Sequence, residues 1–372
     1  MMNLVRDNGL SSVVDVDMPN CLHSRLVKLD ESLEGEIRPR LDGVEDVLAK
    51  AVEADSDVLG TTAGYLLAAG GKRFRPMLVL LAGYFGDPTD PRLIRGAAAI
   101  ELTHVATLYH DDVMDEATSR HGVPSVNARW DNTVAILTGD FLFARSSELA
   151  ADLGPDVCRL LAQTIAILCD GQIRDVASAG DVNKTEHDHL EVIKRKTGVL
   201  IASSCRMGGM VSGAAPVDLE TLGAFGESLG LAFQLSDDIM DITSTQLELG
   251  KEPGTDIREG VYTTPVLHAL SDGPDRDELR RILAAGPPDG ELLDRALEIV
   301  RTSGAVDHAR AGVSSEVTRA VGLARRLPEG HAQHALVQLA RFLAVRCGAA
   351  VEDQELPDAL LGYGRAGEGA DP

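Results

Sequence analysis

Hydrophobic residues along most of the chain recur every three or four positions, the spacing of helices that bury one face. The pattern begins at Glu31 and reaches residues 65–69, where a Gly-Gly pair ends a helix, as glycine does at helix C-termini. Pro76 then opens the next helix, since proline suits the first turn, and a long helix covers residues 92–116. No segment alternates apolar and polar residues as a strand would, so the sequence predicts an all-α fold.

The helical pattern continues through the second half of the chain. We predict helices over residues 135–144, 155–178, 186–213 and 218–242, with shorter amphipathic helices up to about residue 348. Residues 1–30 show no sustained spacing of hydrophobic positions, and the last residues of the chain are rich in Gly, Asp, Glu and Pro. We therefore divide the chain into a loose N-terminal arm (1–30), a single all-α domain (31–355) and a disordered C-terminal tail (356–372).

Composition narrows the function classes. The chain has 372 residues and a net charge of −23, which argues against a nucleic-acid partner because such partners require a basic surface. Its five cysteines are scattered and form no CxxC pair, so we expect them to be reduced thiols and not disulfides. No apolar run is long enough for a membrane span, and no signal peptide is visible. We therefore expect a cytoplasmic protein.

The candidate chemistry begins at the polar end of the helix predicted over residues 92–116. Asp111, Asp112 and Asp115 follow a run of apolar and small residues, and the first and third lie at i and i+4 on one helical face. Like charges held this close repel unless a cation lies between them. Mg²⁺ binds one or two carboxylates and completes its shell with water and phosphate oxygens. The motif therefore predicts a Mg²⁺–phosphate site.

A second copy of this DDxxD motif, formed by Asp237, Asp238 and Asp241, ends another apolar helical stretch. A single copy would be weak evidence in so acidic a chain. The alternative is a pair of solvated acidic helix faces, but such faces do not normally follow apolar runs. Two copies in the same setting favour paired metal sites.

Clustered cations complete the pattern. Lys72, Arg73 and Arg75 stand at the start of the helix that contains Pro76, where side chains and backbone N–H groups would together bind an anion. An ordinary basic helix start is the alternative interpretation. Metal sites of this kind need a polyanionic ligand to complete them, which favours the anion site.

Five motifs in this order resemble those of the trans-prenyl diphosphate synthases, the polyprenyl synthetase family. The resemblance covers residues 40–350 and is strongest to the long-chain branch, which makes hexa-, hepta- and octaprenyl diphosphates. It rests on GKRFRP (71–76), HDDVMD (110–115), Lys196-Thr197, FQLSDDIMD (233–241) and Lys251 in GKEPGTD.

The resemblance implies a transferase with a single-domain helical bundle of the isoprenoid synthase type around a central substrate cavity. Such enzymes join isopentenyl diphosphate head to tail to an allylic diphosphate primer and release pyrophosphate. For this chain it implies a product of thirty to forty carbons, used for quinone side chains or related isoprenoids. It also implies a homodimer without a membrane span, which contacts a membrane transiently when the product is released.

The same resemblance implies roles for individual residues. Mg²⁺, as three ions around the bound diphosphate, would be held by Asp111, Asp115 and Asp237, with Asp112, Asp238 and Asp241 completing the clusters. The allylic diphosphate would be held by Arg120, Lys196, Thr197, Gln234 and Lys251. Isopentenyl diphosphate would be held without metal by Lys72, Arg75, His104 and His121. The catalytic candidates among these are Asp111, Asp112, Asp115, Asp237, Asp238, Arg120, Lys196 and Lys251.

Two features of the chain qualify this picture. The family commonly has two arginines after the first acidic motif, whereas this chain has Arg120-His121; histidine lacks the bidentate fork, so we expect weaker binding of isopentenyl diphosphate. The family's chain-length position, the fifth residue before the first aspartate, is Ala106, with Thr107 beside it and Thr103 about one turn deeper. All three are small, so the resemblance implies elongation beyond twenty carbons.

Four alternatives remain open. A geranylgeranyl or farnesyl diphosphate synthase would share the motifs and stop at a shorter product. A class I terpene cyclase shares the fold and one acidic motif but has no need of the GKRxRP segment. A helical metal phosphohydrolase could use His104, His110 and Asp111, but would leave the second DDxxD unexplained. A non-catalytic partner subunit of a two-component synthase would be expected to have degraded acidic motifs, and here both are intact.

Overall fold

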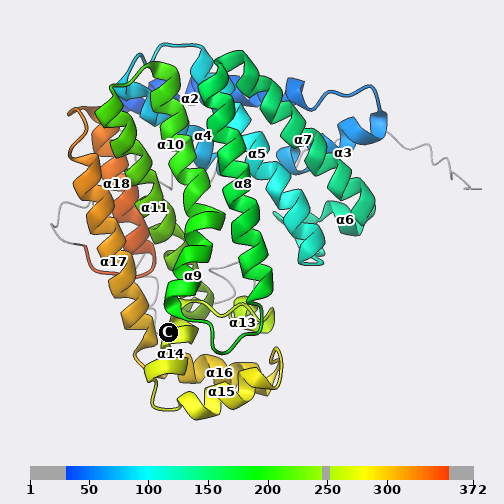
Figure 1. The fold of residues 1–372 in the computed structure, drawn as a ribbon, viewed down its shortest axis with the longest axis vertical. Coiled ribbons are helices and arrows are strands. Elements are labelled where there is room, and N and C mark those ends of the chain that lie inside the picture. Colours follow the sequence, from blue (N-terminus) through cyan, green and yellow to red (C-terminus); the bar gives the residue numbers. More distant parts are fainter. Residues whose placement is uncertain (1–30, 245–251, 352–372) are drawn as a thin grey trace, which may run out of the picture.

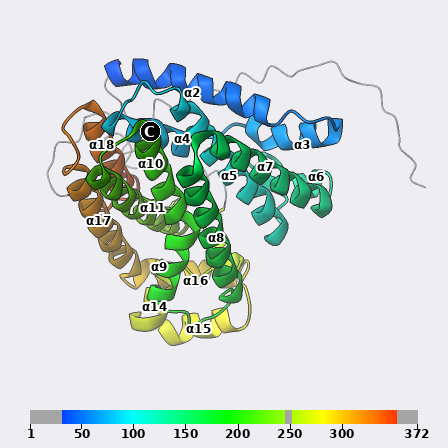
Figure 2. The same ribbon diagram turned by 45° about the horizontal axis from the view of Figure 1, so that its top comes forward.

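The structure is a computed structural model that describes residues 31–244 and 252–351 (Figures 1 and 2). Over these ranges the regular secondary structure is helical apart from one short hairpin, so the predicted all-α fold is confirmed. None of the described helices is both long and apolar enough to cross a bilayer. The predicted N-terminal arm and C-terminal tail lie outside these ranges. The elements in chain order are α2 (Glu31–Ala51), α3 (Asp57–Ala68), α4 (Phe74–Ala82), η1 (Gly83–Phe85), α5 (Arg92–Met114), β1 (Ser119–Arg120), β2 (Val123–Pro124), α6 (Val126–Arg129), α7 (Asn132–Leu153), α8 (Pro155–Ala177), α9 (Glu186–Ile193), η2 (Lys194–Gly198), α10 (Val199–Ser212), α11 (Pro216–Thr243), α13 (Thr255–Arg258), α14 (Thr264–Asp272), α15 (Arg276–Ala284), α16 (Glu291–Thr302), α17 (Ala305–Ala324) and α18 (His331–Arg346).

Helices that are distant in sequence pack side by side around the two that carry the acidic motifs. α5 packs along α7 and against α4, and α11 packs between α10 and α17. In Figure 1, α8, α10, α11, α17 and α18 run alongside one another, with α14, α15 and α16 gathered at one end. At the other end α2 lies against α4 and α5, as Figure 2 shows along its upper edge. This frame fixes α5 and α11, whose C-terminal ends bear the acidic motifs.

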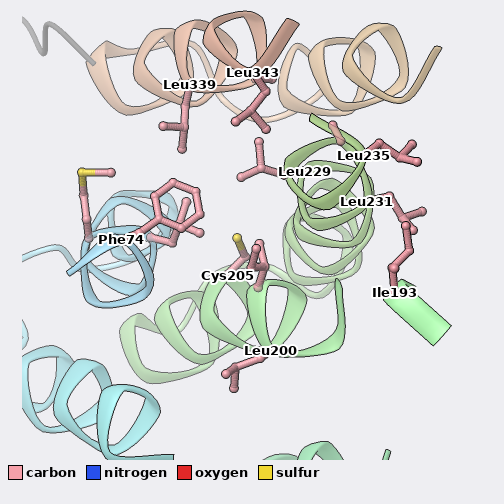
Figure 3. Close-up of a cluster of buried hydrophobic side chains, with 14 of the residues drawn as sticks. Phe74, Ile193, Leu200, Cys205, Leu229, Leu231, Leu235, Leu339 and Leu343 are labelled. Atoms are coloured by element: carbon pink, nitrogen blue, oxygen red, sulfur yellow. The ribbon is translucent and has the colours of Figure 1, made fainter. Parts of the chain in front are cut away.

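A hydrophobic core joins α4, α10, α11 and α18 (Figure 3). Phe74, Cys205, Leu229 and Leu339 come from these four helices and are all buried. Each large apolar side chain that is buried stabilises the fold by about 1.5–3 kcal/mol. Phe74 also stacks on Phe233 of α11, with ring centroids 5.6 Å apart. The core therefore anchors the helix of the second acidic motif.

Local sequence signals set several helix bounds. α7 begins after Asp131, whose carboxylate accepts a hydrogen bond from the Val134 N–H at 2.8 Å, the usual role of an N-cap aspartate. α11 has Pro216 at its first position, as the proline rule predicts. Pro76 was predicted to be the first residue of its helix. α4 instead begins two residues earlier, at Phe74, so Pro76 lies in its first turn.

Two predicted helices are wrong in detail. The helix predicted over residues 186–213 is interrupted, because the five-residue π-helix η2 separates α9 from α10. The helix predicted over residues 92–116 ends at Met114, and Glu116 has a left-handed backbone with a φ of 49°. Both departures from a regular helix fall at predicted site residues. Short π-helices such as η2 are frequent at functional sites.

Candidate active site

The first acidic motif ends α5. Asp115 follows the last helical residue, and its N–H donates to the Asp111 carbonyl at 2.8 Å, so the two residues keep the predicted i and i+4 relationship. Burial raises the pKa of Asp111 to about 6, although Lys196 acts in the opposite direction. Ionising Asp111 is therefore costly in the folded protein, and an added cation would offset that cost.

Asp112 has a different environment. Its side chain is 1% exposed, and Arg120 donates to its Oδ1 from Nε at 2.8 Å and from Nη2 at 2.6 Å. The other oxygen, Oδ2, is buried and has no hydrogen-bond partner among the described residues. Arg120 thus uses part of its donor fork on Asp112, and only the remaining donors are free for the diphosphate that the sequence assigned to it.

Arg120 is presented by the β1–β2 hairpin, in which it pairs with Val123. The two turn residues, His121 and Gly122, have φ values of 52° and 79°, the pattern of a tight hairpin turn that ends in glycine. The Gly70 backbone acts on the His121 imidazole and opposes the lowering of its pKa that burial causes, so the two lie close together. The hairpin therefore brings His121 to the segment that carries the basic cluster.

The π-helix η2 places Lys196 and Thr197 between α8 and α11. Gly198 lies so close to Gly230 of α11 that a Cβ on Gly230 would be 2.6 Å from the Gly198 Cα. On the opposite side, a Cβ on Gly171 of α8 would be 3.0 Å from the backbone nitrogen of Lys196. Glycine alone permits backbones to approach this closely, so these positions hold the π-helix against both neighbours.

The side chains of η2 contact both neighbouring helices. Lys196 Nζ lies 2.9 Å from Asp175 Oδ2 on α8, and Thr197 donates to Gln234 Oε1 on α11 at 3.0 Å. Burial disfavours the Lys196 cation, but Asp175 and then the first acidic motif outweigh it and raise its pKa. Lys251, the remaining predicted ligand of the allylic diphosphate, lies outside the described residues.

Asp238 in the second acidic motif is held at both oxygens. Gln234 Nε2 lies 3.1 Å from its Oδ1, and His189 Nε2 of α9 lies 2.8 Å from its Oδ2, with Asp238 only 1% exposed. Asp241 is also buried, and its Oδ2 accepts a hydrogen bond from the backbone of α13. Asp237 is the most accessible aspartate of this motif. His189 did not figure in any sequence motif.

Arg346, at the end of α18, is a second residue that sequence reasoning missed. Its Nη2 contacts Asp237 Oδ1, and its guanidinium lies 5.4 Å from the Phe233 ring centroid. Burial raises the pKa of Asp237, and Arg346 opposes that shift. The sequence offers only a lone basic residue in the last turn of an amphipathic helix, which is too common a pattern to identify a site.

A buried lysine connects the surroundings of the two motifs. Lys184 is 3.9 Å from Asp175, the same carboxylate that pairs with Lys196. Burial lowers the pKa of Lys184, and Asp175 and then Asp238 oppose the shift. Because Lys196 acts on Asp111 and Lys184 acts on Asp238, the Asp175 group links the first acidic motif to the second.

The basic cluster before α4 divides into two roles. Arg73 departs from the predicted anion site: it has a φ of 44°, is 7% exposed, and its Nη1 lies 3.1 Å from Glu101 Oε1 while its other nitrogens bind Glu45. The left-handed backbone turns Arg73 inward, so its charge is satisfied within the fold. Only Lys72 and Arg75 remain available for an anion.

Arg75 lies within a group of cationic and imidazole side chains. Its Nε–H is buried and has no acceptor among the described residues, so a bound anion would satisfy it. The pKa of His104 is far below its ordinary value, because of burial first and then the charges of Arg75 and the neighbouring hairpin. A neutral His104 can donate one hydrogen bond to an anion at neutral pH. Burial, followed by Arg346, lowers the pKa of Lys72.

The three chain-length candidates lie on α5 but are not equivalent. Ala106 and Thr103 are fully buried, and the Thr103 hydroxyl lies 2.8 Å from Ser146 Oγ on α7, so it is used in helix packing. Thr107 is half-buried and precedes Asp111 by four residues, which puts it on the same face of α5. Thr107 is therefore the best placed of the three to contact a substrate that extends from the acidic motif.

The donor set of the acidic motifs suits a hard divalent cation. Asp111, Asp115 and Asp237 offer carboxylate oxygens, the ligands that Mg²⁺ prefers. Burial raises the pKa of Asp111 and of Asp237, so the folded chain disfavours their negative charges unless a cation is added. These residues would therefore hold Mg²⁺, and the adjacent lysines would bind an anionic ligand beside it.

An all-α bundle with two linked aspartate-rich motifs and an adjoining cationic cluster is the architecture of an isoprenoid synthase. The family model described as polyprenyl synthetase matches residues 56–300. A nonaprenyl diphosphate synthase from Mycobacterium tuberculosis is 40% identical, over 86% of this chain and 96% of its own length. The heptaprenyl diphosphate synthase component 2 from Geobacillus stearothermophilus is 39% identical, over 82% and 95%.

A solved structure agrees with these relatives. The geranylgeranyl pyrophosphate synthase from Corynebacterium glutamicum, crystallised with calcium and isoprenyl diphosphate, is 42% identical, with a TM-score of 0.77 over 86% of this chain and 99% of that chain. The chain belongs to the polyprenyl synthetase family, as its motifs predicted. The predicted enzyme class, a transferase, is confirmed with it.

Proposed function

We propose that the protein condenses isopentenyl diphosphate with an allylic diphosphate, head to tail, and releases pyrophosphate. The observation that carries the proposal is the presence of two kinds of anion site beside each other. One is built from acidic motifs and lysines around Asp175, and the other from Arg75, His104 and Lys72. A reaction that joins two diphosphates needs one site for each.

The acidic motifs bind the allylic diphosphate. Asp111, Asp115 and Asp237 would hold Mg²⁺, which neutralises the charge that builds on the departing pyrophosphate. Lys196 and the free donors of Arg120 contact the same phosphate oxygens directly. Asp112, Asp238 and Asp241 are buried and hydrogen-bonded, so we assign them to orienting the motifs or to water-mediated contacts.

The second diphosphate needs no metal, because cations and a neutral imidazole surround it. Arg75 would direct its buried Nε–H at the anion, and His104 would donate one hydrogen bond. Lys72 adds a point charge, and His121 reaches the same region through its contact with Gly70. The lowered pKa of His121, which burial causes first and Arg120 second, leaves it neutral at pH 7 and weakens its hold on an anion.

The reaction follows from these positions. The C–O bond of the allylic substrate breaks, and its electron pair leaves with pyrophosphate. The isopentenyl double bond then attacks the allylic carbon and forms the new C–C bond. A proton is lost to pyrophosphate as the double bond re-forms, so the site requires no side chain of near-neutral pKa as base.

We propose a product of thirty to forty carbons that serves quinone side chains or related isoprenoids. The small residues Ala106 and Thr107 support it, and so does the name of the heptaprenyl relative, which denotes about thirty-five carbons. The name of the nonaprenyl relative denotes about forty-five carbons and supports only a product longer than twenty carbons. A twenty-carbon product is the second candidate, because the Corynebacterium glutamicum structure bears the name of a geranylgeranyl pyrophosphate synthase. The two candidates share the site and differ only in how far the chain grows.

We also propose that the protein is a cytoplasmic homodimer. Apolar side chains are exposed on the paired helices α7 and α8: Leu137 and Ile136 at 58% and 43%, Ile173 and Val176 at 71% and 59%. Exposed apolar residues in number on neighbouring helices mark an interaction surface. Sedimentation should give twice the chain mass of 39.5 kDa. A monomer that becomes active only with a second protein would instead indicate a two-component enzyme.

One incubation tests the reaction. Purified protein receives Mg²⁺, labelled isopentenyl diphosphate and an allylic primer, and the products are dephosphorylated and separated by chain length. We expect labelled polyprenols that require both substrates and Mg²⁺. Release of cyclic hydrocarbon from the primer alone, or of free phosphate without coupling, would overturn the proposal.

A further inference from the structure

Outside the catalytic site, three helices bring one carboxylate and two imidazoles together. Glu186 is the first residue of α9, His268 lies on α14 and His308 on α17. Their ligand atoms all lie within 4.8 Å of one another. None of the three belongs to a motif that the proposed function uses.

The contacts within this group are close and specific. His268 Nδ1 lies 3.2 Å from Glu186 Oε1, and His308 Nε2 lies 2.8 Å from Glu186 Oε2. The two imidazoles stack with centroids 3.8 Å apart and an interplanar angle of 9°. Each oxygen of one carboxylate therefore contacts a nitrogen of a different imidazole ring.

We propose that Glu186, His268 and His308 form a binding site for a zinc-like transition-metal ion, separate from the Mg²⁺ site. Imidazole nitrogen with carboxylate oxygen suits Zn²⁺ and its neighbours, whereas Mg²⁺ prefers oxygen alone. In tetrahedral Zn²⁺ sites the bonds are about 2.0–2.1 Å and the donors roughly 3.3 Å apart. The widest separation here, 4.8 Å at most, has to shrink by about 1.5 Å. Side chains that are 20–45% exposed can make that movement by rotamer adjustment.

A cavity beside the three residues leaves room for a fourth ligand. Glu186 also lines a surface cavity of about 450 Å³ together with Lys184 and Arg280, so water or a small anion can complete the shell. A metal here ties the start of α9 to α14 and α17. The same helix carries His189, which holds Asp238, so the site stabilises the support of the second acidic motif.

Zinc binding to the full-length protein tests the proposal. Equilibrium dialysis is run with Zn²⁺ in the presence of millimolar Mg²⁺, which occupies the aspartate motifs. We expect one Zn²⁺ per chain at micromolar free metal, and a rise in Tm on binding. Glu186→Gln, His268→Ala and His308→Ala should each weaken binding at least about tenfold, since each removes one of three ligands.

The matched control is His334→Ala, which removes an exposed histidine of α18 and should leave zinc binding unchanged. Circular dichroism and Mg²⁺-dependent turnover of each variant establish that it is folded, and Glu186→Gln preserves the shape of the side chain it replaces. The proposal is overturned if the wild-type protein binds no Zn²⁺ under these conditions. It is equally overturned if folded variants of all three residues bind Zn²⁺ as tightly as the wild type.

Discussion

His189 on α9 lies 2.8 Å from Asp238 on α11, and both side chains are almost completely buried. This contact fixes one oxygen of Asp238 while Gln234 fixes the other. The second acidic motif is therefore oriented by the protein itself. Residues that hold metal-site carboxylates in this way commonly matter nearly as much as the ligands.

Replacing His189 should weaken metal binding without removing a ligand. In His189→Leu, Asp238 Oδ2 loses its partner in a buried setting while Gln234 still holds Oδ1. We therefore expect the free energy of unfolding to fall by about 1–3 kcal/mol and the Mg²⁺ requirement to rise about 10–100-fold. His189→Gln, which can still donate a hydrogen bond, should recover part of both. Turnover measured against Mg²⁺ concentration checks this. An unchanged Mg²⁺ dependence in a folded His189→Leu protein would show that the contact serves packing only.

Neutralising the accessible aspartates should stop catalysis and leave the fold intact. We expect Asp111→Asn and Asp237→Asn each to lower kcat at least about 100-fold, the scale of losing one electrostatic element of transition-state stabilisation. Since burial raises the pKa of Asp111 from 3.8 to about 6, ionisation of Asp111 lowers the stability of the metal-free protein as the pH rises between these two values, and the loss is complete above the higher one. Metal-free Asp111→Asn should therefore unfold at the same or a higher temperature than the wild type at pH 7.5. Near-normal turnover in either variant, or activity that survives a chelator, would contradict the metal role.

The position of the π-helix η2 against α11 depends on the close approach of Gly230 to Gly198, so a larger residue at 230 should disturb it. Gly322 on α17, which has open space around it, provides the control. Gly230→Ala would place a Cβ 2.6 Å from the Gly198 Cα, so we expect a loss of stability of about 1–3 kcal/mol, the range for overpacked cores. Because η2 carries Lys196 and Thr197, kcat should also fall. Gly322→Ala on α17 meets no atom within 4 Å and should be neutral or stabilising. Equal effects in both variants would show that helix propensity alone is at work.

These contacts mark how far sequence can predict the site. The acidic motifs stand out because residue type and local spacing identify them, whereas Lys196 and Gln234 are assigned only through the resemblance to the family. His189 and Arg346 do not, since their partners are distant in sequence and only tertiary packing brings them together. The all-α fold follows from periodicity, but a π-helix that depends on inter-helix glycine contacts leaves no periodic signal. Arg73 was assigned with its basic neighbours because its left-handed backbone, which turns it inward, is invisible in the sequence.

The hairpin histidine gives a prediction about one substrate only. His121→Arg should lower KM for isopentenyl diphosphate and leave the primer's KM nearly unchanged, because arginine adds a permanent charge and a donor fork near Arg75 and His104. The φ of 52° is a mild strain for either residue, so stability should change by less than about 1 kcal/mol. Steady-state kinetics with each substrate varied separately measures the effect. An unchanged or raised KM for isopentenyl diphosphate would mean that residue 121 does not face that substrate.

Product length offers the sharpest test, because one side chain should decide it. On the proposed function, a growing chain bound at its diphosphate end near Asp111 and Asp237 would extend away from them, and we expect α5 to form one wall of that path. Ala106 is fully buried and Thr107, on the Asp111 face, is half-buried. A phenylalanine at either position adds a ring where the chain would pass.

We expect the wild-type enzyme to elongate beyond twenty carbons, and Ala106→Phe or Thr107→Phe to shift products to fifteen or twenty carbons with the metal site intact. Thr107 should be the more effective position, because a ring at buried Ala106 also has to displace packed neighbours at a cost of about 1–3 kcal/mol. Chromatography of the dephosphorylated products distinguishes the cases, and turnover of the first condensation shows that each variant is folded. If the wild-type enzyme already stops at fifteen or twenty carbons, small residues on α5 do not set the length, because a wall that is already open cannot account for early termination.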